Sequence, residues 1–160
     1  MVERKDAEKE TKVIVFRLNE EEYGAEVRVI RSIERMQPVT RMPQMPAFVK
    51  GVINLRGVIT PVIDLKTRLS LGDTVQDQQT RIIIVSVHDM QVGLIVDAAT
   101  DVIDIPVHAI EPPPMLLEGI HSSFIRGVAK LPERLLILLN LDQVLSQEEF
   151  QQLQQMERSL

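Results

Sequence analysis

The sequence contains no cysteine, which excludes a disulfide framework, a catalytic thiol and thiolate metal ligands. Its three histidines, His88, His108 and His121, are far apart and lack the paired spacing of a metal site. No apolar run approaches the ~18 residues that a membrane-spanning helix needs, and residues 1–11 are too charged for a signal peptide. These absences predict a cytoplasmic protein that binds no metal and does not insert into a membrane.

The side-chain combinations of common catalytic sites are also missing. There is no Gly-rich phosphate loop, and Ser86 and His88 lack the Gly-rich oxyanion turn of a hydrolase. Asp97, Asp101 and Asp104 lack the central Gly and terminal Glu of an EF-hand loop. We therefore expect no enzymatic activity and no cofactor, and an enzyme with an unfamiliar site is kept as an alternative.

The sequence is rich in aliphatic residues and poor in aromatic residues. Apolar residues make up 44% of the 160 residues and aromatic residues only 3%, so the core must consist of Val, Ile and Leu, which favours β-sheets. The net charge of −5 and the pI near 5.2 disfavour a nucleic-acid surface, which is typically basic. A small β-barrel that binds nucleic acid is the second hypothesis, and the scarcity of aromatic residues for base stacking also disfavours it.

The chain contains an internal repeat. A shift of 69 positions aligns residues 12–43 with residues 81–112, and it superimposes apolar runs and a glycine in each copy. After an insertion in the second copy, a shift of 76 aligns Phe48–Val52 with Phe124–Val128. Glycine, phenylalanine and proline residues that match in order indicate two copies of one unit.

Each copy, at about residues 12–69 and 81–145, has about five short strands separated by turn signals, which is the pattern of a small barrel. Residues 70–80 form a polar linker between the copies. After the second copy, capping-box spacing and an apolar residue every three or four positions predict a helix at about residues 146–158. Its apolar stripe indicates packing on the same protein, with a partner helix as the alternative.

Local signals in the first copy predict three further features. Met45–Gly51 fits one helical turn, because Pro stands near its start and Gly at its end. Arg56 and Gly57 form a hairpin turn in which Gly57 supplies a positive φ. Asp64 is expected to cap a short helix over Leu65–Leu69.

The stretch Val49–Leu65, VKGVINLRGVITPVIDL, resembles the signature of the CheW family of chemotaxis coupling proteins. Glu22-Tyr23-Gly24 and Leu135–Leu141 are similar to other parts of the family pattern. The resemblance extends from Lys12 to about Phe150, so residues 1–160 are identified as a single CheW-like domain. The chain has no room for the additional domains of the relatives CheA and CheV, and we expect a free-standing coupling domain.

The resemblance implies a mostly β fold of two intertwined, five-stranded SH3-like barrels with short helices and a C-terminal helix. It implies a non-catalytic adaptor that binds the regulatory domain of the histidine kinase CheA and the cytoplasmic tip of methyl-accepting chemoreceptors. Such an adaptor associates with membrane-bound receptor arrays through protein contacts alone. Transmission of a signal then requires that it bind the signalling states of the complex unequally.

The resemblance also implies receptor-binding residues, namely Ile30, Ile33, Arg56 and Val102. Arg56 is the strongest of these candidates, because its repeat counterpart is Pro132, so the repeat itself does not require an arginine. Its planar guanidinium suits an acidic or carbonyl-rich partner. The alternatives are that an exposed turn tolerates Arg56 and that the two isoleucines belong to the core.

The kinase-binding residues implied by the resemblance are Val39, Met42, Lys50, Met115 and Leu116. The alternative for Val39 and Met42 is that both are buried in the core and do not contact a partner. Met115 and Leu116 follow three prolines in the insertion of the second copy, and this stiff segment is poorly suited to a barrel wall. Glu111 departs from the family, because many relatives have a basic residue at that position.

Overall fold

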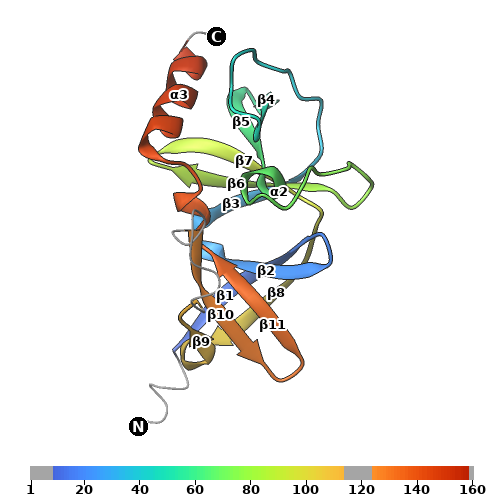
Figure 1. The fold of residues 1–160 in the computed structure, drawn as a ribbon, viewed down its shortest axis with the longest axis vertical. Helices are drawn as coiled ribbons and strands as arrows, with labels where there is room; N and C mark the ends of the chain where they lie inside the picture. The colour runs from blue at the N-terminus through green and yellow to red at the C-terminus, as the bar shows by residue number, and fades with distance from the viewer. Residues whose placement is uncertain (1–8, 114–123, 159–160) are drawn as a thin grey trace.

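The computed structural model describes residues 9–113 and 124–158, and it divides them between two β-barrels stacked along the long axis (Figure 1). The lower barrel is a sheet with the strand order β8-β1-β2-β11-β10-β9. Its strands are β1 (Glu10–Leu18), β2 (Glu21–Glu26), β8 (Ala98–Pro106), β9 (Ile110–Glu111), β10 (Ile125–Leu131) and β11 (Arg134–Leu139).

The upper barrel is a five-stranded sheet with the order β3-β6-β7-β5-β4. Its strands are β3 (Ile30–Arg35), β4 (Val49–Leu55), β5 (Val58–Asp64), β6 (Arg81–Val87) and β7 (Met90–Val96). The helices are η1 (Val27–Val29), α2 (Leu65–Arg68), η2 (Val107–Ala109), η5 (Leu141–Gln143) and α3 (Gln147–Arg158).

The two barrels are intertwined because each contains a hairpin from the other copy of the repeat. The β1–β2 hairpin of the first copy lies in the lower barrel, where β2 pairs in parallel with β11. The β6–β7 hairpin of the second copy lies in the upper barrel, where β7 pairs in parallel with β5. The predicted fold class is thereby confirmed, with the difference that the two-residue β9 gives the lower sheet a sixth strand.

Repeat-related glycines allow the two barrels to close. Thr40 pairs with β4 in the upper barrel, as Glu111 pairs with β10 in the lower barrel. A Cβ atom on Gly51 would lie 2.0 Å from the Thr40 carbonyl oxygen, and one on Gly127 would lie 2.5 Å from that of Glu111. Gly51 also has a φ of +145°, a backbone conformation that residues with a side chain rarely adopt. The crossing chain can approach the strand only where the side chain is absent.

One continuous core joins the barrels. The largest buried cluster includes Phe16 and Tyr23 of the lower barrel, Ile83 and Leu94 of the upper barrel, and Leu153 of α3. Because this apolar cluster crosses the contact between the barrels, separating them would expose much of the core to water. The barrels therefore form one body.

The C-terminal helix packs on its own protein, as its pattern predicts. The Ser146 N–H donates to Glu149 Oε1 at 2.7 Å, and the Glu149 N–H donates to Ser146 Oγ at 3.1 Å, so the capping box is formed. Phe150, Leu153 and Met156 are buried. The apolar stripe of α3 is thus already covered within the chain.

Arg68 connects the two copies near the start of this helix. Its guanidinium lies over the rings of both Phe48 and Phe124, at 4.8 and 4.7 Å from their centroids, and these two residues are repeat counterparts. It also pairs with Glu149 at 2.9 Å and donates to the Val144 carbonyl at 2.8 Å. A single cation is therefore held by both halves of the chain.

Two of the local expectations in the first copy are confirmed and one is wrong. Asp64 accepts a hydrogen bond from the Lys66 N–H at 3.1 Å and caps α2, and Gly57 has a φ of +88°. Met45–Gly51, however, contains a turn closed by the Val49 N–H on the Pro46 carbonyl, and β4 begins at Val49. Pairing of β4 with β5 supplies tertiary hydrogen bonds that a single helical turn cannot match.

Candidate interaction surfaces

The β4–β5 turn places Arg56 at an exposed tip. Arg56 and Gly57 both have positive φ values, of 51° and 88°, which is the geometry of a tight two-residue hairpin. The Gly57 N–H donates to the Asn54 side-chain oxygen at 2.8 Å and so holds the turn. The Arg56 side chain is 72% exposed, in agreement with a residue at a hairpin tip.

Arg56 is nevertheless engaged by its own chain. Its Nη2 lies 3.3 and 3.2 Å from the two carboxylate oxygens of Glu34, whose side chain is only 14% exposed. A hydrogen bond from Ser32, and the Arg56 guanidinium in addition, lower the pKa of Glu34 against the opposing effect of burial. Glu34 lies on β3 and Arg56 at the end of β4, and these strands are the two ends of the upper sheet. The ion pair therefore closes the sheet and orients the guanidinium.

Glu34 was missed by the sequence analysis. An acidic residue within the strand IRSIER carries no local signal of a partner 22 positions away. The remaining donors of Arg56, on Nε and Nη1, have no hydrogen-bond partner among the residues that the structure describes. They are available to an external acceptor.

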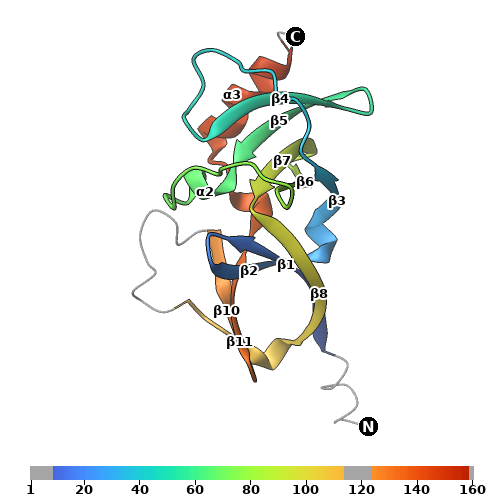
Figure 2. The ribbon, with the colours of Figure 1, turned by 90° about the vertical axis from the view of Figure 1, so that its right-hand side faces the viewer.

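The other receptor candidates fall on one side of the molecule but differ in exposure. Figure 2 shows β3 and β8 one above the other on the right-hand side, and these strands contain Ile33 and Val102. Ile33 is 38% exposed and Val102 is 53% exposed. Ile30 is half-buried and packs against the largest core cluster, so it belongs to the core and is not an exposed contact residue.

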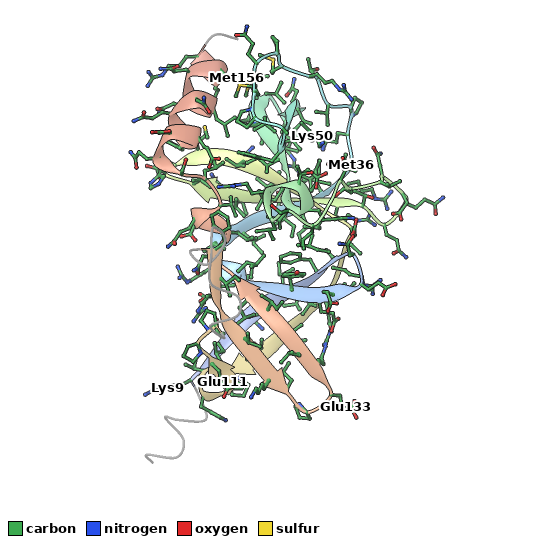
Figure 3. All side chains as sticks on the ribbon, in the orientation of Figure 1. Lys9, Met36, Lys50, Glu111, Glu133 and Met156 are labelled. Atoms are coloured by element: carbon green, nitrogen blue, oxygen red, sulfur yellow. The ribbon has the colours of Figure 1, made fainter. Side chains whose placement is uncertain are left out.

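The residues predicted to bind the kinase also differ in position: some line a cavity and one packs against the core. Val39 and Lys50 line a cavity of about 610 Å³ beside the upper barrel. Met36, on the same side in Figure 3, lines it as well. Met42 does not line this cavity and is half-buried against the largest core cluster. Met115 and Leu116 lie outside the described residues.

Glu111 lies at the far end of the lower barrel (Figure 3). Its carboxylate pairs with Lys130 at 2.9 Å, and both side chains are exposed. The chain therefore supplies a cation beside the Glu111 carboxylate. An exposed pair of this kind stabilises the protein little and leaves both groups accessible.

A second ion-pair network, also missed by the sequence analysis, lies on the lower barrel. Arg134 pairs with Glu22 at 2.8 Å and with Asp101 at 3.3 Å, and so connects β11 with β2 and β8. The hydrogen bond from Arg134 lowers the pKa of Glu22, and burial opposes this effect. Each barrel thus has one arginine, at or beside a hairpin turn, that pairs with a carboxylate on an edge strand.

Residues 9–113 and 124–158 contain no group of His, Asp and Glu side chains that could hold a metal ion. Within the same ranges, no helix is both long and apolar enough to cross a membrane.

Known proteins resemble this chain over most of its length. A family model described as the CheW-like domain matches residues 12–149. The chemotaxis protein CheW of Bacillus subtilis is 42% identical over 140 residues, which cover 88% of this chain and 90% of that protein. The chemotaxis protein CheW of Klebsiella aerogenes is 35% identical over 136 residues, covering 85% and 82% of the two chains. The crystal structure of the scaffolding protein TtCheW from Thermoanaerobacter tengcongensis superimposes with a TM-score of 0.79 at 38% identity, covering 87% of this chain and 90% of the other.

Proposed function

This chain belongs to the CheW-like domain family and is a coupling adaptor of chemotaxis signalling, and from that premise we propose how it acts. It connects the cytoplasmic tip of methyl-accepting chemoreceptors to the regulatory domain of CheA and catalyses no reaction itself. The observation that carries this proposal is the family match over residues 12–149, which leaves none of the described strands outside the shared domain. No finding favours the nucleic-acid-binding alternative.

We propose that the receptor binds the side of the molecule formed by β3 and β8, with the tip of the β4–β5 turn. Ile33 and Val102 offer exposed apolar contacts there, and Arg56 offers its unpaired donors. Exposed aliphatic side chains beside an oriented arginine are typical of a protein-binding surface. Ile30 supports this surface from the core rather than by direct contact.

The kinase domain, in our proposal, binds the upper barrel at the cavity lined by Val39 and Lys50. Met42 contributes by packing on the largest core cluster, and Met115 and Leu116, which lie outside the described residues, make a further contact with the kinase. Because a continuous core makes the two barrels one body, a receptor at β3 and β8 and a kinase at the cavity are held in a defined relative orientation. Coupling then follows if the adaptor binds the active and inactive arrangements of the complex with different affinities. The adaptor would act in the cytoplasm, at receptor arrays that it joins through protein contacts.

The test is reconstitution with purified components. The chain is mixed with CheA and receptor-containing membranes, and sedimentation and CheA autophosphorylation are measured with and without it. We expect the chain to bring CheA down with the membranes and to make its activity depend on the receptor. Failure to bind either component would contradict the proposal, and salt-sensitive binding of an oligonucleotide instead would favour the alternative.

A further inference from the structure

The repeat relates an ion pair of the lower barrel to an unpaired cation of the upper barrel. In the lower barrel, Arg126 of β10 forms an ion pair with Glu26 at the end of β2. The shift of 76 places Lys50 at the position of Arg126, and the shift of 69 places Ile95 at the position of Glu26. The strand pairing agrees, since Glu26 faces Val13 as Ile95 faces Ile82. The upper barrel thus has a cation at the matching position but an aliphatic side chain where the lower barrel has the carboxylate.

Lys50 and Ile95 both line the cavity of about 610 Å³. Lys50 is half-buried, and neither it nor the neighbouring Arg41 has an ion pair or side-chain hydrogen bond within the described residues. The one carboxylate in the lining, Asp64, is buried and already accepts hydrogen bonds from Lys66 and Thr74. The cavity therefore presents two cations, Lys50 and Arg41, that form no ion pair within the described residues, together with one buried carboxylate that is held by neutral donors.

Apolar side chains line part of the cavity, together with the polar residues Gln37, Thr74, Gln76 and Thr80. Met36, Pro38 and Val39 line the cavity beside Arg41 and Lys50. Apolar contacts around an ion pair exclude water, and an ion pair shielded from water is stronger than an exposed one. The arrangement suits a protein segment that presents a carboxylate between apolar side chains, more than a small hydrophilic anion.

We propose that an aspartate or glutamate side chain of the CheA regulatory domain enters this cavity and pairs with Lys50. It takes the position that Glu26 occupies beside Arg126 in the lower barrel, with Arg41 as a second cation at the entrance. The inference rests on the proposed function, because it names the chemistry of the kinase contact.

The test compares binding of the isolated CheA regulatory domain to the full chain and its variants by calorimetry at two salt concentrations. Lys50→Met should weaken binding about tenfold and reduce its dependence on salt, since it removes one half of an interfacial ion pair. Lys50→Arg should keep most of the affinity. Lys12→Met is the matched control, because Lys12 pairs with Asp104 on the lower barrel, away from the cavity, and binding should be unchanged.

Stability separates loss of the contact from loss of the fold. Lys50 has no partner within the described residues, so Lys50→Met should melt within a few degrees of the wild type. A charge reversal then identifies the partner residue: Lys50→Glu should lose binding, and one Asp→Lys or Glu→Lys change in the kinase domain should restore it.

Normal affinity of Lys50→Met for the kinase domain would overturn the inference while leaving the proposed function intact. Lys50-dependent binding of inorganic phosphate that competes with the kinase domain would overturn it as well, by showing a small-anion site. If the wild-type chain does not bind the kinase domain at all, the proposed function fails, and this inference fails with it.

Discussion

Replacement of Arg56 should separate stability from coupling, and the structure sets both magnitudes. The Arg56 side chain is 72% exposed, and its ion pair with Glu34 spans 3.2 Å at the rim of the upper barrel. Pairs with this exposure contribute at most about 1 kcal/mol to the free energy of unfolding. In a chain of this size, Arg56→Ala should therefore lower Tm by no more than about 2–4 °C.

The effect on coupling should be larger. A guanidinium that donates to an acceptor within an interface can contribute about 2 kcal/mol, so its removal should weaken receptor binding more than tenfold. Arg56→Lys keeps the charge and loses the planar donors, and we expect it to restore only part of the affinity. The assays are a thermal melt and receptor-dependent activation of CheA in the presence of each variant.

A charge exchange between the two partners provides the sharpest control. Arg56→Glu alone places a second carboxylate against Glu34. Its effect therefore combines repulsion within the protein with any loss of partner binding. The double variant Arg56→Glu with Glu34→Arg rebuilds the ion pair and moves the guanidinium to β3. It should regain stability without regaining coupling. If Arg56→Ala both melts and couples normally, Arg56 is only a tolerated turn residue and its proposed contact is refuted.

Three further predictions concern the fold and the expected lack of chemistry. Gly51→Ala should lower Tm by roughly 6–12 °C in a thermal melt, because its Cβ would lie 2.0 Å from the Thr40 carbonyl oxygen. Gly72→Ala shares the backbone strain, since Gly72 has a φ of +106°, but its Cβ would meet nothing within 4 Å, so it should lower Tm less. Because the pKa of Glu22 is lowered in the folded state, its stabilising effect is complete above the unfolded pKa and is lost as the pH falls through the folded pKa. Glu22→Gln should therefore flatten the fall in stability as the pH drops below the usual glutamate pKa of 4.5, and an unchanged pH profile would contradict the role of its pair with Arg134. Calorimetry with zinc or ATP should show no binding, and stoichiometric binding of either would show that a site was overlooked.

Several structural features could be predicted from local sequence because local interactions determine them. The capping box of Ser146 and Glu149 depends on a spacing of three residues, and the cap of α2 depends on Asp64 alone. The positive φ of Gly57 follows from the demands of a two-residue turn. The expected helical turn over Met45–Gly51 failed for the complementary reason, since strand pairing with β5 competes with it and is not visible in seven residues.

The candidate surfaces were only partly predictable. Exposure of Arg56 followed from its place in a turn, whereas its pairing with Glu34 depends on the closure of a sheet whose end strands are β3 and β4. Ile30 and Ile33 are three positions apart in β3, so strand alternation places them on opposite faces, in agreement with the observed burial pattern. Which of the two faces packs on the largest core cluster depends on which strands come together.

The duplication, the absence of known catalytic motifs and the family could all be recognised from the sequence by itself, because each depends only on the identity and order of residues. Only the tertiary structure decided which groups in the two copies are paired. Arg126 meets Glu26 within its barrel, whereas Lys50 faces a cavity beside Ile95, although the two cations align in the repeat. The physical reason is that an ion pair acts over a few ångströms of space, and the exchange of hairpins between the barrels brings together residues that lie far apart along the chain.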